Sequence, residues 1–203
     1  MTRAIYLASR SPRRRELLKQ IGVAFEIVLL REDMRRGVDV DETPLPGERA
    51  DAYALRIACA KAELAVRYLG RRSLPGRPVL AADTTVVCDD RIIGKPAGRE
   101  DAVRILEGLS ERRHDVFTAV ALAAGDRTEQ AISLSKVWFR ELSDEEIRRY
   151  VATGEPLDKA GAYAIQGRAA VFVPHIEGSF SGIMGLPLAE TADLLRRFDI
   201  ELL

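Results

Sequence analysis

Residues 7–15 combine residue types and spacing that suit the binding of an anion. They read Leu-Ala-Ser-Arg-Ser-Pro-Arg-Arg-Arg and continue the short apolar run that starts at Ala4. The pattern predicts a buried strand, a turn through small hydroxyl residues and a helix that begins at Pro12 with Ser11 as its cap. Three arginines in a first helical turn oppose the helix dipole. This arrangement indicates a bound anion, and phosphate is the anion that fits best.

Asp83 is the single residue of the chain that most specifically indicates a functional site. It lies between the apolar runs 79–82 and 86–87, so we expect the strand to be interrupted at Asp83-Thr84. An ionised carboxylate in such surroundings is costly unless a metal, a cation or water meets it. Because buried carboxylates cluster at functional sites, we favour a functional role. The alternative is an aspartate that ends one strand and caps a turn.

Two lysines and one acidic loop are weaker candidates when each is taken alone. Lys95 follows a glycine that permits close approach of a ligand, and its ammonium group suits a phosphate. Lys61 lies near the boundary of the apolar face of a long helix, and Glu42 lies in a proline-rich loop. The alternative for Lys95 is a surface lysine in a turn. For Lys61 it is a lysine whose aliphatic chain covers apolar surface, and for Glu42 it is a solvated acidic turn.

The loop 161–167 is bracketed by glycines and contains one aromatic residue and one amide, Gln166. An amide offers both a donor and an acceptor, which suits the edge of a nucleobase. The alternative is a tight connection that merely requires glycine. The glycine-containing segments 178–182 and 185–187 share this ambiguity.

Composition limits the classes of protein. The chain has 203 residues, with 31 Lys plus Arg balanced by 31 Asp plus Glu, so no global field attracts nucleic acid or a membrane surface. Cys59 and Cys88 are expected to be buried and reduced, and His114 and His175 lack the spacing of a zinc site. No signal peptide and no apolar run of about 18 residues is present, so we expect a cytoplasmic protein.

Strands alternate with helices, which predicts an α/β fold in a single domain over residues 1–203. A hairpin in the middle of the chain implies a mixed sheet. Strands are expected over 4–8, 25–30, 79–82 with 85–88, 92–93, 116–124, 131–140 and 170–176. Helices are expected over 12–21, 48–69, 99–109, 143–152 and 187–198, and residues 31–47 are expected to be irregular.

Eight short segments together resemble the Maf-like proteins, and they occur in the order seen in that family over nearly the whole chain. They are Ser9-Arg10-Ser11-Pro12-Arg13-Arg14, Asp41-Glu42-Thr43, Lys61-Ala62, Ala82-Asp83-Thr84, Gly94-Lys95-Pro96, Asp158-Lys159-Ala160-Gly161-Ala162-Tyr163, Ile165-Gln166-Gly167 and Gly185-Leu186-Pro187-Leu188. Two departures are Ala164, where glycine is usual, and Gly178-Ser179-Phe180-Ser181, where a tyrosine is common.

The resemblance implies a nucleoside triphosphate pyrophosphatase of the branch that cleaves dTTP and UTP. It implies an elongated mixed β-sheet with flanking helices and a cleft between two lobes, as in inosine triphosphatases. Asp83 falls at the proton-acceptor position. Glu42, Lys61 and Lys95 fall at catalytic or phosphate-contacting positions, and Ser9 falls within the substrate-binding segment. By the same resemblance, the specificity positions fall on Arg13, Thr84 and Gln166.

The expected reaction is attack of water at the α-phosphorus, with release of pyrophosphate and a nucleoside monophosphate. Arg13, Lys61 and Lys95 would neutralise the phosphates. Glu42 and Asp83 would hold Mg²⁺ or Mn²⁺, and Asp83 would orient or deprotonate the water. The alternative is a nucleotide-binding regulator of cell division without turnover. The oligomeric state stays open, with a homodimer as one option.

Overall fold

The computed structural model describes residues 4–30, 40–72 and 74–202. Within them the chain forms two compact units. Unit 1 comprises the described residues within 1–83, 118–133 and 185–203, and unit 2 comprises residues 84–117 and 134–184. The prediction of an irregular segment at 31–47 falls partly on residues 31–39, which lie outside the described residues. From residue 40 to 47 the described chain has neither helix nor strand, as expected, and the helix expected from residue 48 begins at Ala50.

Seven strands of the described chain form one mixed sheet in the order β2-β1-β3-β5-β6-β7, and β4 also pairs with β3. Strands β1 (Ile5–Leu7), β2 (Phe25–Ile27) and β3 (Val79–Cys88) are parallel neighbours, whereas β4 (Arg91–Ile93) is antiparallel to β3. Strands β5 (Arg113–Ala124) and β6 (Arg127–Trp138) are joined by a two-residue turn, and β7 (His175–Glu177) is antiparallel to β6. The predicted α/β class with a mixed sheet is confirmed.

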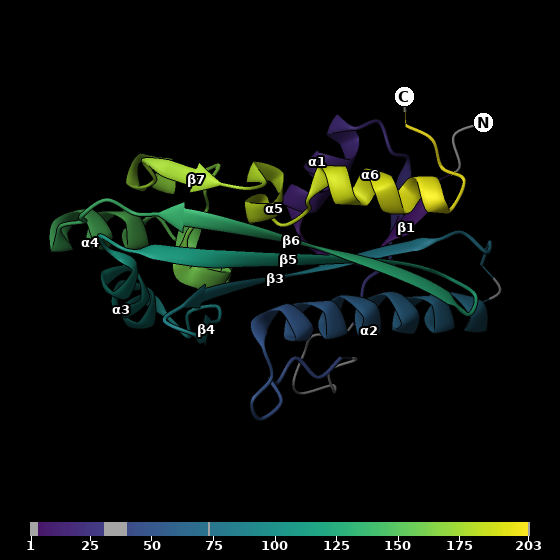
Figure 1. The fold of residues 1–203 in the computed structure, drawn as a ribbon, viewed down its shortest axis with the longest axis horizontal. Coiled ribbons are helices and arrows are strands. Elements are labelled where there is room, and N and C mark those ends of the chain that lie inside the picture. The colour runs from purple at the N-terminus through teal and green to yellow at the C-terminus, as the bar shows by residue number, and fades with distance from the viewer. Residues whose placement is uncertain (1–3, 31–39, 73, 203) are drawn as a thin grey trace. The chain divides into compact units, whose positions relative to one another are not determined.

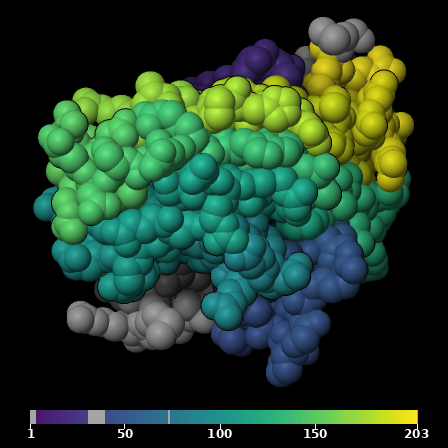
Figure 2. Space-filling model, turned by 60° about the vertical axis from the view of Figure 1, so that its left-hand side comes forward, coloured from purple at the N-terminus to yellow at the C-terminus, as the bar shows by residue number. Residues whose placement is uncertain are grey.

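In unit 1, helix α2 (Ala50–Arg71) covers one face of the sheet, and helices α1 (Pro12–Gln20) and α6 (Leu188–Arg197) cover the other (Figure 1). The buried face of α2 carries residues at three- and four-residue steps, such as Ala54, Ile57 and Ala58, which are all 0% exposed. The outer residues of α6 are polar, and this C-terminal segment forms part of the molecular surface, yellow in Figure 2.

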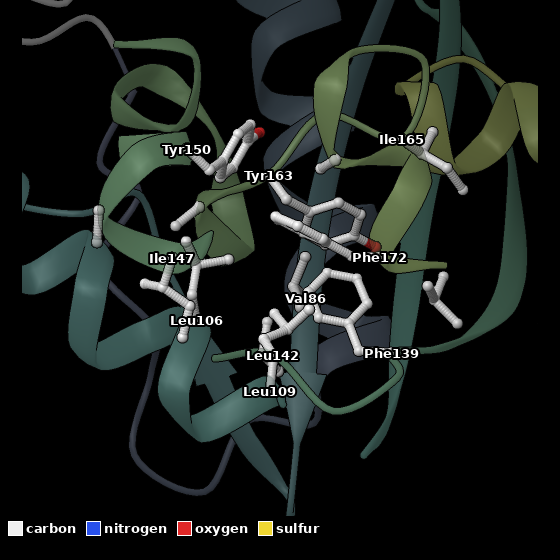
Figure 3. Packing of buried hydrophobic residues seen from close by; sticks show 14 of the residues in the cluster. Val86, Leu106, Leu109, Phe139, Leu142, Ile147, Tyr150, Tyr163, Ile165 and Phe172 are labelled. Atoms are coloured by element: carbon white, nitrogen blue, oxygen red, sulfur yellow. The ribbon is translucent and has the colours of Figure 1, made fainter. Parts of the chain in front are cut away.

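Unit 2 has its own aromatic core beneath helices α3 (Arg99–Leu109) and α4 (Asp144–Ala152). The rings of Phe139, Tyr163 and Phe172 pack edge to face in this cluster (Figure 3). Helix α4 begins with the predicted capping box, in which Ser143 and Glu146 satisfy each other's backbone N–H groups. A short helix α5 (Phe180–Met184) follows β7.

Three expectations were wrong. Strand β3 runs without interruption through Asp83, because the carboxylate has a cationic partner on α2 and need not break the strand. The strand expected at 170–176 is a 3-10 helix over Arg168–Phe172 followed by the short β7. Cys59 is only half-buried, since it lies at the edge of the packed face of α2, where its thiol contacts Gln130.

No helix in the described part of the chain is both long enough and apolar enough to cross a membrane.

Candidate active site

The loop after β1 is held by hydrogen bonds among its own hydroxyl and guanidinium groups. Ser11 caps α1 as predicted, with Oγ accepting the backbone N–H of Arg14 at 3.5 Å. Ser9 Oγ accepts the backbone N–H of Ser11 at 3.1 Å and a guanidinium N–H of Arg14 at 3.3 Å. Arg14 also donates to the carbonyl of Gly185 at 2.7 Å. Arg14 therefore fastens this loop to the segment that precedes α6.

The three arginines of this turn have different surroundings. Arg15 donates to the carbonyl of Arg10 at 3.3 Å, and Arg14 is bonded as described above. Arg13 is half-buried, and within residues 4–30, 40–72 and 74–202 no hydrogen bond or ion pair joins its side chain to another residue. Of the three arginines, Arg13 is thus the one whose side chain makes no such contact with the described residues.

Lys61 lies between the two predicted acidic residues. Its Nζ is 2.9 Å from Oδ1 of Asp83 and 2.7 Å from Oε1 of Glu42. The side chains of Lys61 and Asp83 are 14% and 12% exposed, whereas that of Glu42 is 44% exposed. The structure therefore brings together three candidates that the sequence places 19 or more residues apart, and it leaves the carboxylate of Glu42 open to solvent.

The parallel register of β1 and β3 brings the loop that follows β1 alongside the middle of β3. Leu7 is paired with Leu80, and the backbone N–H of Ala8 donates to the carbonyl of Leu80 at 2.8 Å. Continuing this register by two residues puts Ser9 level with Ala82, next to Asp83. Ligands of parallel α/β sheets commonly bind at the carboxyl ends of the strands, and this loop follows the carboxyl end of β1, while Asp83 lies in the middle of β3.

Two residues of α2 hold the loop that carries Glu42, and sequence reasoning missed both. The hydroxyl of Tyr53 donates to the backbone carbonyl of Glu42 at 2.8 Å. Arg56 donates to the carbonyl of Thr43 at 3.1 Å and to both carboxylate oxygens of Glu48 at 2.7 Å. Nothing local in the sequence indicates the polar contact of Tyr53.

The charges of this region shift two ionisations. Burial, with Asp83 and Glu42 nearby, raises the pKa of Tyr53 to about 12, so its hydroxyl stays a donor. The hydrogen bonds from Arg56, followed by the one from the backbone N–H of Leu45, lower the pKa of Glu48 to about 2. Both members of the Arg56–Glu48 ion pair therefore stay charged over the whole ordinary pH range.

The other three predicted residues, Thr84, Lys95 and Gln166, belong to unit 2. Thr84 follows Asp83 in β3 and is half-buried, and the side chains of Lys95 and Gln166 are exposed. The segments of Lys95 and Gln166 are adjacent, because the backbone N–H of Gly161 donates to the carbonyl of Gly94 at 3.2 Å. Gly161 has φ +71°, and a Cβ there would lie 3.0 Å from Val86 Cγ2, so this position requires glycine.

The described residues offer few ligands to a metal ion. Among the described residues, no group of three or more His, Cys, Asp and Glu side chains could hold a metal by itself. The two carboxylates that approach Lys61 are oxygen donors of the kind Mg²⁺ prefers, and Mg²⁺ commonly takes only one or two carboxylates together with substrate phosphates and water. The residues present therefore fit a metal that arrives with a nucleotide.

The fold and site define an α/β protein in which a loop rich in serine and arginine follows strand β1 and an acid–lysine–acid cluster joins α2, the middle of β3 and the Glu42 loop. A HAM1 protein from Coxiella burnetii has a similar fold, with a TM-score of 0.52 at 16% sequence identity over 96% of this chain and 99% of that one.

Residues 4–198 match the family model described as Maf-like protein, and the chain belongs to that family. A protein of Aromatoleum aromaticum named dTTP/UTP pyrophosphatase is 60% identical over 96% of this chain and 95% of its own length. A protein of Dechloromonas aromatica with the same name is 56% identical over 95% of this chain and 96% of its own. The resemblance found in the eight sequence segments is confirmed.

Proposed function

We propose that the protein hydrolyses dTTP and UTP to the nucleoside monophosphate and pyrophosphate. The observation that carries this proposal is the position of Lys61 between Glu42 and Asp83, beside the loop of Ser9 and Arg13. A site that only binds an anion gains nothing from two carboxylates, because they repel the ligand. A hydrolase needs such groups to position water and metal. The names of the two relatives agree with this activity.

The protein's own residues divide the chemistry between them. Asp83 orients the attacking water and accepts its proton, with Lys61 fixing the carboxylate at Oδ1. Arg13 and Lys95 bind the phosphates, and Lys61 adds charge that favours the departing pyrophosphate. Ser9 fixes the loop in the conformation that presents Arg13. Phosphoryl transfer depends mostly on positioning and charge neutralisation, and these residues supply both.

Glu42 and Asp83 are the residues that would hold Mg²⁺ or Mn²⁺. The ion would supply charge neutralisation at the phosphate oxygens and lower the pKa of a bound water. Thr84 and Gln166 are proposed to contact the nucleobase, because an amide can donate and accept along the edge of a pyrimidine. Arg13 lies at a further specificity position of the family pattern.

The proposal extends to the cellular compartment, the class of ligand and the oligomeric state of the protein. The two cysteines of the described chain are free thiols, which supports a reducing compartment such as the cytoplasm. The equal numbers of acidic and basic residues support a small-molecule substrate rather than nucleic acid. A homodimer is compatible with the proposal and is not required by it.

The experiment is to incubate the purified chain and Mg²⁺ with UTP, dTTP, CTP, ATP, GTP and 7-methyl-GTP, and to measure pyrophosphate and monophosphate. Equal amounts of the two products, formed fastest from UTP and dTTP, are the expected result. Binding of these nucleotides without any product would instead support the alternative, a nucleotide-binding regulator of cell division. Release of orthophosphate would contradict the proposed bond cleavage.

A further inference from the structure

The segment that carries Gln166 is a tight turn with a fixed direction. The backbone N–H of Gly167 donates to the carbonyl of Ala164 at 2.9 Å, which closes a turn over residues 164–167. Tyr163, Ala164 and Ile165 are buried, whereas Gln166 is exposed. The turn therefore directs the Gln166 side chain toward solvent, while the residues that precede it anchor the turn in the core.

One tyrosine holds the turn on the side that precedes Gln166. The hydroxyl of Tyr150, on α4, accepts the backbone N–H of Ala164 at 3.1 Å and donates to Oε1 of Glu155 at 2.9 Å. Its ring is 4% exposed and packs edge to face on Phe172 in the core of unit 2 (Figure 3). Burial and, next, the bond to Glu155 raise the pKa of Tyr150 above its usual value, so the hydroxyl stays protonated.

One glutamate holds the turn on the side that follows Gln166. Both carboxylate oxygens of Glu155 accept the backbone N–H of Arg168, at 3.1 and 3.3 Å. A Cβ at Gly167 would lie 2.6 Å from Cδ of Glu155, so the glycine leaves room for this carboxylate. The backbone groups two residues before and two residues after Gln166 are thus fastened to one Tyr150–Glu155 pair.

We propose that Tyr150 and Glu155 are positioning residues that set the discrimination between nucleobases by holding the turn that presents Gln166. The proposal rests on the proposed function, in which Gln166 reads the base. A misplaced amide loses its hydrogen bonds to the correct base while the phosphate chemistry is left in place. The pair therefore affects the choice of substrate more than the rate of cleavage.

The first test is Tyr150→Phe, which keeps the ring and removes the hydroxyl. We expect kcat/KM for UTP to fall about tenfold, mainly through KM, and that for GTP to change less than about twofold. Tyr68→Phe is the matched control, since Tyr68 is on α2 and its ring packs on Arg72. Equal losses with UTP and GTP would show a merely structural role and overturn the proposal.

The second test separates hydrogen bonding from charge. In Glu155→Gln, one amide oxygen at the position of Oε1 can still accept from both Tyr150 and Arg168, so the UTP-to-GTP ratio should stay within about twofold of wild type. Glu155→Ala should lower that ratio about tenfold. A Gln variant as impaired as the Ala variant would overturn the proposal.

The third test asks whether the effect passes through Gln166. In a Gln166→Ala background, Tyr150→Phe should change the UTP-to-GTP ratio by less than about twofold, because the group being positioned is absent. Full additivity of the two substitutions would overturn the proposal. If the wild-type protein hydrolyses UTP with preference and the variants keep that preference, only this inference fails; a wild type without UTP hydrolysis overturns the proposed function as well.

Discussion

The ammonium nitrogen of Lys61 lies 2.9 Å from Oδ1 of Asp83, and the two side chains are 14% and 12% exposed. Helix α2 supplies the cation and strand β3 supplies the anion, so the packing of the helix on the sheet forms the pair. Glu42 reaches the same nitrogen from a loop, at 2.7 Å. Two carboxylates thus share one cation, and the cluster retains a formal negative charge that suits a divalent ion brought by a nucleotide.

Lys61→Met removes the cation and keeps most of the stem. Because a shielded carboxylate then loses its charged partner, we expect a loss of about 2–3 kcal/mol in the free energy of unfolding, measured by urea titration. Hydrolysis of UTP should fall at least a hundredfold. Lys136→Met is the control, since Lys136 forms an exposed pair with Glu177 and should change stability by less than about 1 kcal/mol. Equal effects of the two substitutions would refute the special position of Lys61.

Asp83→Asn keeps the shape of the side chain and an acceptor oxygen for Lys61. Turnover of UTP should fall about a thousandfold, because an amide cannot accept the proton of the attacking water. The free energy of unfolding should change by about 1 kcal/mol or less, and circular dichroism should show an unchanged fold. Near-normal turnover in this variant would remove Asp83 from the proposed chemistry.

Tyr53→Phe tests whether α2 positions Glu42. The substitution removes a hydrogen bond of 2.8 Å to the Glu42 carbonyl and leaves the carboxylate itself in place. We expect a loss of about 1 kcal/mol in stability and a several-fold higher Mg²⁺ concentration for half-maximal hydrolysis. Tyr68→Phe, on the same helix, should leave both quantities unchanged. An unaltered Mg²⁺ requirement in Tyr53→Phe would show that the bond does not serve the site.

Local signals in the sequence were enough to predict the ends of several elements. Ser11 and Ser143 cap the helices expected of them, because capping depends on residues only three positions away. The continuity of β3 could not be predicted in the same way. It depends on Lys61, which is 22 residues from Asp83 in the chain and meets it only after α2 has packed on the sheet.

The candidate site shows the same division. Asp83 can be recognised in the sequence because it is a charged residue within an apolar run. Lys61 and Glu42 have equally good non-functional explanations in the sequence, and only the fold brings them together with Asp83. Tyr53 and Arg56 hold the Glu42 loop through backbone carbonyls, and such contacts depend on the path of the loop rather than on residue type. The 3-10 helix that replaces the expected strand at 170–176 is likewise set by its surroundings: the backbone N–H of Arg140 donates to the carbonyl of Phe172.

His114 makes stability sensitive to acid. It is 0% exposed, and burial lowers its pKa from 6.5 to about 4, while Nε2 lies 2.9 Å from the hydroxyl of Tyr163. Between these pKa values the unfolded chain binds a proton that the folded chain does not, so stability falls as the pH falls. The contribution should be about 2 kcal/mol between pH 7 and pH 5.

Urea unfolding at the two pH values measures this contribution. His114→Phe should lower stability at pH 7, because Tyr163 loses a partner, yet it should reduce the difference between pH 7 and pH 5 by about 2 kcal/mol. His175→Ala removes the exposed histidine and should preserve the difference seen in wild type. If His114→Phe kept the full difference in stability between pH 7 and pH 5, groups other than His114 would be its cause.

Gly167→Ala tests the steric relationship between the turn and Glu155. The new Cβ would lie 2.6 Å from Cδ of Glu155, which the bonds to Tyr150 and Arg168 hold in place. We expect a loss of about 1–2 kcal/mol in the free energy of unfolding, since the carboxylate must move and release its partners. In a Glu155→Ala background the same substitution should cost less than about 0.5 kcal/mol, because the clash is gone.

Gly108→Ala is the matched control for this prediction. Gly108 lies in α3, and a Cβ there meets nothing within 4 Å, so alanine should stabilise the helix by about 0.5–1 kcal/mol. If Gly167→Ala is as harmful without Glu155 as with it, the cause lies in the backbone of residue 167 itself. Gly167 has φ −103°, which alanine also adopts, so relief of the clash by Glu155→Ala is the outcome that its geometry predicts.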